Sequence, residues 1–98
     1  MFVSVTTVGG GGPDVADKAR MAGESMLPWL QAFEGYAGLT ILADRESGRA
    51  RIVTFWDSRE AVERSERGRK QVRESMVSAA KATIERVELF ELVLEDRR

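Results

Sequence analysis

The feature that most constrains this chain is its closing apolar segment, residues 85–94, which carries apolar side chains at both odd and even positions. The two sets are Val87, Leu89 and Val93, and Phe90, Leu92 and Leu94. Because successive side chains of a strand point to opposite sheet faces, such a strand is apolar on both sides. Two earlier segments repeat the pattern, with Ile52 and Trp56 against Val53 and Phe55, and with Leu39 and Ile41 against Leu42. A sheet with one face in water would alternate cleanly, so the sequence predicts a sheet that is covered on both faces.

Apolar periodicity and turn residues divide the chain into six elements. A β-branched run at residues 2–8 predicts a strand, and the glycines from 9 to 12 predict a loop. Apolar residues then recur at helical spacing from Val15 to Phe33, where Pro28 is expected to kink or break the helix near Leu27. The remaining predictions are strands at about 39–43, 51–56 and 85–94, a hairpin turn at 44–48, and a helix at about 59–81 that begins at an Asp57-Ser58 cap.

This order of elements predicts an α+β fold, the ferredoxin-like βαββαβ arrangement, in which two helices cover one face of a four-stranded antiparallel sheet. Residues 1–98 are expected to form a single domain with a frayed tail at 95–98. A chain of this length buries only roughly 60–65% of the surface that its unfolded state exposes. We therefore expect the second apolar face to pack against the same face of a second copy, as a homodimer whose two sheets form a dimeric α/β barrel.

The charge balance argues against a nucleic-acid partner. Fifteen basic and sixteen acidic residues give a net charge of −1, whereas a general nucleic-acid binder needs a surplus of cations. Basic residues do gather at Arg67, Arg69, Lys70 and Arg73, but acid-then-base pairs such as Glu66 and Lys70 run along the same segment at i,i+4 spacing. We interpret this segment as a solvated, ion-paired helix face.

The chain has no cysteine and no histidine. Disulfides, thiolate nucleophiles, ordinary zinc sites and histidine-based acid–base chemistry are therefore excluded. No cofactor and no metal is implied, and any proton transfer falls to a carboxylate, Tyr36, a lysine, water or the substrate itself. No apolar segment approaches the length of a membrane span and no signal peptide is recognisable, so we expect no membrane partner and a cytoplasmic location.

The second predicted helix has an inner face with small side chains in its middle. With Val62 taken as inward, that face carries Ser65, Gly68 or Arg69, Val72, Met76 and Ala79. A mid-helix glycine costs roughly 0.8–1 kcal/mol relative to alanine, so Gly68 should have a reason. One reason is that Ser65 and Gly68 leave room for a ligand between helix and sheet. Close packing of the helix on the sheet is the alternative, and the residues leave both open.

Trp56 ends a strand directly before this helix, where its ring and its N–H donor could form one wall of such a pocket. Phe33 and Tyr36 could close the same space, and Thr6 is a candidate polar contact. For the aromatic residues, ordinary core packing is the competing interpretation.

Two short motifs resemble a known family. The first is Phe33-Glu34-Gly35-Tyr36-Ala37-Gly38-Leu39, and the second is Val53-Thr54-Phe55-Trp56-Asp57-Ser58-Arg59-Glu60-Ala61. They are similar to the aromatic-x-Gly-aromatic turn and the Trp-x-Ser helix start of the antibiotic biosynthesis monooxygenase-like domain. The resemblance extends to the order of elements over most of the chain.

The resemblance implies a dimeric α/β barrel with a pocket between sheet and helices in each subunit. Members of the family oxidise aromatic polyketide phenols to quinones without metal or flavin, degrade haem, or rearrange small metabolites. Trp56 matches the quinone-forming pattern, but the places of its Asn, Tyr and Arg hold Ile52, Val62 and Met76. The second-helix Trp of the haem-degrading pattern falls on Ser65, and its His is absent.

The sequence therefore predicts a cofactor-independent, monooxygenase-like protein that binds a small aromatic or hydrophobic metabolite. The predicted substrate-binding residues are Trp56, Tyr36, Thr6, Phe33, Ser65, Val72 and Met76. The alternatives are a non-catalytic ligand-binding or structural module of the same fold, and a cofactor-free cyclase or isomerase.

Overall fold

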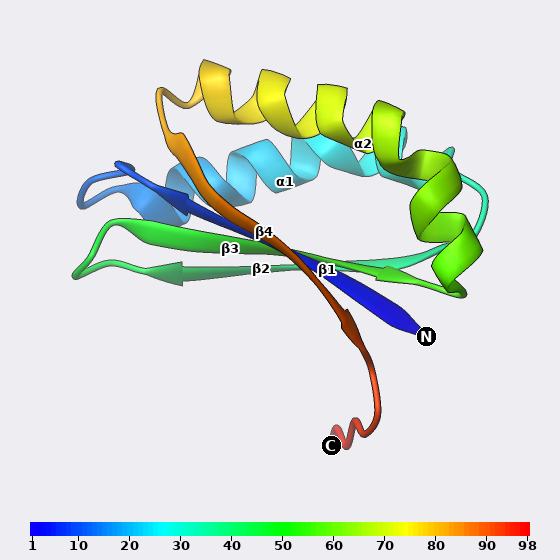
Figure 1. Ribbon diagram of the computed structural model, residues 1–98. Coiled ribbons are helices and arrows are strands. Elements are labelled where there is room, and N and C mark those ends of the chain that lie inside the picture. The colour runs from blue at the N-terminus through cyan, green and yellow to red at the C-terminus, as the bar shows by residue number, and fades with distance from the viewer.

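A computed structural model describes all residues from 1 to 98 and contains six elements in βαββαβ order (Figure 1). They are β1 (Phe2–Gly9), α1 (Val15–Gln31), β2 (Tyr36–Asp44), β3 (Arg49–Trp56), α2 (Arg59–Ala79) and β4 (Thr83–Glu91). The predicted fold class is confirmed: four antiparallel strands form one sheet in the order β2-β3-β1-β4, and both helices lie on one face of it. No helix is both long and apolar enough to cross a membrane.

The register of the sheet decides which side chains share a face. On the central strand β1, Ser4 lies opposite Thr54 and Thr6 lies opposite Ile52. On the other side of β1, Ser4 lies opposite Leu89 of β4. Since directly opposed residues point to the same face, the helix-covered side of β1 carries Phe2, Ser4, Thr6 and Val8. The polar middle of this row is unusual for the floor of a core.

The buried core gathers at one end of the space between sheet and helices. Met26 and Leu30 of α1, Trp56 of β3, and Ala61 and Val62 of α2 form the cluster. Trp56 is fully buried and Leu30 is 2% exposed. Gly35 lets the chain turn tightly here: its φ is +85°, and its α-carbon faces Ala61 so closely that a side chain would collide with it.

The ends of α2 follow local rules. Ser58 caps its start, since the Ser58 hydroxyl accepts a hydrogen bond from the Ala61 N–H at 3.1 Å. The helix ends at Ala79, two residues before the predicted end, because Lys81 adopts a left-handed conformation with φ of +56°.

Several other predicted boundaries were wrong. The first helix continues through Pro28 to Gln31, so the predicted break near Leu27 does not occur, and the alternative of a kink stays a prediction. Both middle strands are longer than predicted, because β2 pairs with β3 along its whole length from Tyr36 to Asp44. The last strand ends at Glu91 instead of Leu94, because its neighbour β1 begins at Phe2, which lies opposite Glu91.

The face of the sheet away from the helices is bare (Figure 1). By register it carries Val3, Val5, Val53, Phe55, Leu42 and Phe90, together with the polar residues Thr7, Thr40, Arg51, Arg86 and Glu88. Leu42 and Phe90 are 51% and 50% exposed. The chain after β4 leaves the sheet on this side, and its residues Val93 and Leu94 are more than four-fifths exposed.

Candidate functional site

An apolar cavity of about 50 Å³ lies between the sheet and the helices. Its walls come from β1, β2 and β3 and from the facing sides of α1 and α2. The lining residues are Val8, Gly9, Gly11, Val15, Lys18, Ala19, Ala22, Gly23, Ile41, Gly48, Ala50, Ile52, Met76, Val77, Ala80 and Ala82. Lys18 is the one residue with an ionisable side chain in this wall, so the cavity suits an apolar group.

A second, polar cavity of about 20 Å³ lies further along the same elements. It is lined by Ser4, Thr6, Met26, Leu30, Ile52, Thr54, Arg69 and Arg73. Ile52 lines both cavities. Arg69 and Arg73 of α2 line the polar cavity, and Met76 and Val77, on the next turn of the same helix, line the apolar one. The two cavities therefore follow one another between sheet and helices.

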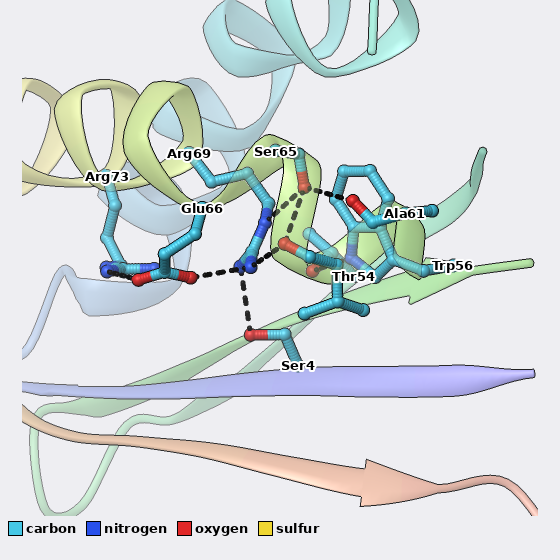
Figure 2. A network of polar contacts seen from close by, with 9 residues as sticks. Ser4, Thr54, Trp56, Ala61, Ser65, Glu66, Arg69 and Arg73 are labelled. Carbon is cyan, nitrogen blue, oxygen red and sulfur yellow. Dashed lines mark hydrogen bonds and ion pairs between the residues drawn. The ribbon is translucent and has the colours of Figure 1, made fainter. Parts of the chain in front are cut away.

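The Arg69 side chain reaches from α2 down to the sheet (Figure 2). Its Nε donates to the Ser65 hydroxyl at 2.8 Å, and its Nη2 donates to the Val62 carbonyl at 2.9 Å and to Glu66 at 2.7 Å. A longer contact of 3.5 Å reaches the Ser4 hydroxyl on β1. These contacts hold the guanidinium in a fixed position above the strands.

Arg69 is only 5% exposed, and burial lowers the pKa of its guanidinium from the ordinary value, with nearby Arg73 acting in the same direction and Glu66 opposing it. A guanidinium remains charged at neutral pH even so. Arg69 is therefore a permanent buried cation. The interpretation of this segment as a solvated, ion-paired face was wrong for Arg69 and for Arg73, because both side chains turn under the helix.

Arg73 is 8% exposed and also lines the polar cavity. Its nearest carboxylate oxygen belongs to Glu66, at 3.9 Å, and its buried Nε has no hydrogen-bond partner. Glu66 thus forms ion pairs with both arginines, and its own side chain is 55% exposed. The predicted pair of Glu66 with Lys70 is replaced by these contacts. Two buried cations share one half-exposed carboxylate, so the polar cavity has a surplus positive charge.

The hydroxyls below the arginines add hydrogen-bonding capacity. Thr54 is buried, and its hydroxyl accepts the Trp56 indole N–H at 2.9 Å, which leaves its own proton free to donate. Thr6 and Ser4 are also buried on β1 and line the same space. The polar cavity thus offers donors from two strands and one helix.

The structure brings two of the predicted site residues to these cavities: Thr6 lines the polar one and Met76 the apolar one. Trp56, Phe33, Tyr36 and Val72 lie in and around the core cluster, outside the lining of either cavity. Their role in ligand binding stays a prediction.

Trp56 is nevertheless coupled to the polar cavity. The Arg69 guanidinium lies over its ring, 5.2 Å from the centroid. The Phe33 and Tyr36 rings also pack near Trp56, at centroid distances of 6.2 and 5.8 Å. Burial raises the pKa of the Tyr36 hydroxyl, so this group stays protonated at neutral pH.

Ser65 and Gly68 do not border an open space. The Ser65 hydroxyl donates to the carbonyls of Ala61 and Val62 and accepts from Arg69. A methyl group on Gly68 would lie 2.7 Å from the Phe33 ring. The small residues on α2 therefore make room for an arginine and an aromatic ring of the chain itself, and the apolar cavity lies further along the helix, at Met76 and Val77.

Sequence reasoning missed Arg69, Arg73, Ser4 and Thr54 as residues of the site. A signal existed: positions 65, 69 and 73 are four residues apart and so lie on one side of α2. The polar residues at 4 and 6 and at 54 alternate with apolar ones, which places them on one sheet face with the arginines above.

The described residues contain no cluster of carboxylates, histidines or cysteines that could hold a metal ion. The groups that meet the two cavities are guanidinium, ammonium and hydroxyl groups and apolar side chains. Such a site can hold and desolvate a ligand and stabilise negative charge on it, whereas it offers no strong base.

No protein-family model and no curated protein matches this sequence. Solved structures do match over the whole chain. One, from Deinococcus radiodurans and described as an antibiotic biosynthesis monooxygenase, has a TM-score of 0.70 at 16% identity and covers 100% of this chain and 98% of its own.

Two further structures are similar in fold. A monooxygenase from the ActVA-Orf6 gene of Streptomyces coelicolor, solved with nanaomycin D, gives a TM-score of 0.66 at 17% identity, with 97% of this chain and 92% of its own covered. SnoaB, a cofactor-independent oxygenase from Streptomyces nogalater, gives 0.64 at 16%, with 96% and 92% covered. The chain therefore has the fold of the antibiotic biosynthesis monooxygenase-like domain.

Proposed function

We propose that this chain is a monooxygenase-like protein that binds a small hydrophobic metabolite in the apolar cavity between its sheet and its helices. The observation that carries the proposal is the cavity itself, with small side chains such as Ala22, Gly23 and Ala50 in its wall. Small-molecule sites are apolar spaces with a few polar groups, and this cavity has that character, although at about 50 Å³ it is smaller than a typical site. Neighbours of the same fold that are described as oxygenases support the class of chemistry.

The proposed unit is a homodimer that packs through the bare face of the sheet. Phe55 and Val53 on β3 and Val5 on β1 are partly exposed there, beside the more exposed Leu42 and Phe90. An exposed apolar area on a soluble domain usually marks an interface. The apolar row crosses adjacent strands on one face, so a second copy can cover it with the same surface.

The proposed chemistry is oxidation by O2 with electrons supplied by the ligand. For 1-naphthol as a probe, one O2 inserts one oxygen atom and releases the other as water, giving 1,4-naphthoquinone. The hydroxyl hydrogen and the hydrogen on ring carbon C4 leave as that water, and the four electrons that reduce O2 come from the naphthol. The protein's part is to hold and desolvate the electron-rich ligand.

The test measures 1-naphthol binding by isothermal titration calorimetry and O2 uptake with an oxygen electrode. The variant Ala50→Leu fills the cavity from its floor, because Ala50 is buried on β3. Its matched control is Ala43→Leu, since Ala43 lies directly opposite Ala50 on β2 but is exposed and outside the cavity.

We expect wild type and Ala43→Leu to bind the probe, and Ala50→Leu to lose at least about tenfold in affinity, which corresponds to about 1.4 kcal/mol. Equal affinity in all three proteins would contradict the site. Binding without O2 uptake would contradict the oxidation and favour a non-catalytic binding module.

A further inference from the structure

The polar cavity carries a positive charge that no group of the chain balances. Arg69 and Arg73 are both more than nine-tenths buried, and Glu66 is the only carboxylate that pairs with either of them. Buried charges are ordinarily paired, because removing an ion from water without a partner is costly. An arrangement with a surplus buried cation is therefore suited to an anion that comes from outside.

Arg73 identifies where the anion would bind. Its Nε is buried and lacks any hydrogen-bond partner, although the side chain lines the polar cavity. A buried donor without a partner is rare in folded proteins and calls for an explanation. Hydroxyls of Thr6 and Thr54 line the same space from the sheet. An oxyanion in this position would accept hydrogen bonds from both the helix and the strands.

The neighbouring cavity indicates what is attached to that anion. Both cavities share Ile52, and the apolar one continues past Met76 and Val77 of α2. A ligand that filled both would have an anionic group at Arg73 and an apolar body above Ala50. Figure 2 shows the two arginines, with Glu66 between them, above Ser4 and Thr54.

We infer that the ligand of this protein is a hydrophobic carboxylate, whose carboxylate binds at Arg73 in the polar cavity while its apolar body occupies the apolar cavity. The inference rests on the proposed function, because it assigns a substrate class to that same site. It adds the role of the arginines, which select an anionic ligand over a neutral one of the same shape.

The experiment compares two probes of nearly the same shape, 1-naphthoate and its neutral counterpart 1-naphthamide. Calorimetry at neutral pH, in a buffer free of carboxylates and phosphate, gives Kd for each probe with four proteins: wild type, Arg73→Gln, Arg73→Lys and Arg67→Gln. Arg67 is the control because it is an exposed arginine on the same helix.

We expect wild type and Arg67→Gln to bind 1-naphthoate at least about tenfold more tightly than 1-naphthamide, since a hydrogen bond to a charged group is about twice as strong as a neutral one. In Arg73→Gln the ratio should fall towards one with the 1-naphthamide Kd unchanged. Arg73→Lys should keep part of the preference, because it keeps the charge.

Equal affinity of wild type for the two probes, or a preference that survives Arg73→Gln, would overturn the inference and leave the proposed hydrophobic site standing. If neither probe bound, the proposed function itself would fail. Urea unfolding of Arg73→Gln checks its fold, and should stay close to wild type because the Nε has no partner to lose and the contact with Glu66 is long, at 3.9 Å. If this variant does not fold, the two probes on wild type still decide the question.

Discussion

The guanidinium of Arg69 lies 5.2 Å above the ring of Trp56, and this contact joins the polar cavity to the hydrophobic core. The same indole donates its N–H to Thr54, whose hydroxyl lines the polar cavity from below. A residue of the core and a residue of the candidate site thus share one network. Changes to Arg69 should therefore alter stability as well as ligand binding.

The first prediction concerns Arg69→Ala. The change removes the hydrogen bonds to Ser65 and to the Val62 carbonyl and leaves space above Trp56. We expect the free energy of unfolding to fall by about 1–3 kcal/mol, the usual cost of leaving buried polar groups unpaired. Urea denaturation measures it. The matched change Arg67→Ala, on the exposed side of α2, should alter the same quantity by less than about 0.5 kcal/mol; equal effects would contradict the buried placement of Arg69.

The second prediction concerns the turn between α1 and β2. Gly35 has a φ of +85°, and an added methyl group would lie against the Ala61 side chain. Gly10→Ala is the control, because Gly10 also has a positive φ, of +79°, but faces open space. Both changes should bear the left-handed strain of about 1–2 kcal/mol, and only Gly35→Ala should add a collision. Thermal denaturation should therefore show the larger loss for Gly35→Ala, and a larger loss for Gly10→Ala would refute this account of the turn.

The third prediction tests the homodimer. Phe90 lies opposite Val3 on the bare sheet face and is 50% exposed. Phe90→Glu should separate the dimer, because a carboxylate placed in an apolar interface loses its hydration without gaining a partner. Light scattering at micromolar concentration should report two chains for wild type and one for the variant. Met21→Glu, at an exposed position of α1, should remain dimeric; a monomeric wild type would contradict the interface.

The fourth prediction concerns acid stability. Hydrogen bonds from Ser47, together with backbone N–H groups, lower the pKa of Asp44 in the hairpin below its ordinary value. A carboxyl whose pKa is lowered on folding stabilises the protein above its unfolded pKa, and this contribution disappears as the pH falls through the folded pKa. Between about pH 5 and about pH 2, Asp44→Asn should therefore lose less stability than wild type. The free energy of unfolding, measured by urea denaturation at several pH values, checks this. An equal loss in the two proteins over this range would contradict the prediction.

The sequence was sufficient for the fold because the strand signals agreed with one another. β-branched runs, the polar turn at residues 44–48 and the Ser58 cap each predicted a local structure, and together they matched one topology. The errors at element ends came from tertiary pairing. Periodicity cannot show that the pairing of β4 with β1 ends at Glu91, with one further hydrogen bond from the Leu92 N–H to the Met1 carbonyl, or that Lys81 turns left-handed.

The candidate site was harder to predict because the charge pattern of α2 indicated a solvated surface, whereas the spacing of its arginines indicated the side that faces the sheet. Glu66, Lys70 and their neighbours resemble a solvated helix surface, but Arg69 and Arg73 lie one turn apart on the inner side. Only the height of the helix above the sheet decides whether an arginine can reach Ser4. Likewise, the sequence could not show that the Phe33 ring fills the space beside Gly68.

The most direct test of the central claim is a map of where a ligand binds. In a two-dimensional ¹H–¹⁵N NMR titration with 1-naphthoate, the amides of Val8, Gly23 and Ala50 should shift, together with the side-chain Nε–H of Arg73. Signals of Val5, Val53 and Phe55 on the opposite sheet face should stay in place. Shifts confined to that opposite face, with the cavity residues unchanged, would contradict a ligand site between the sheet and the helices.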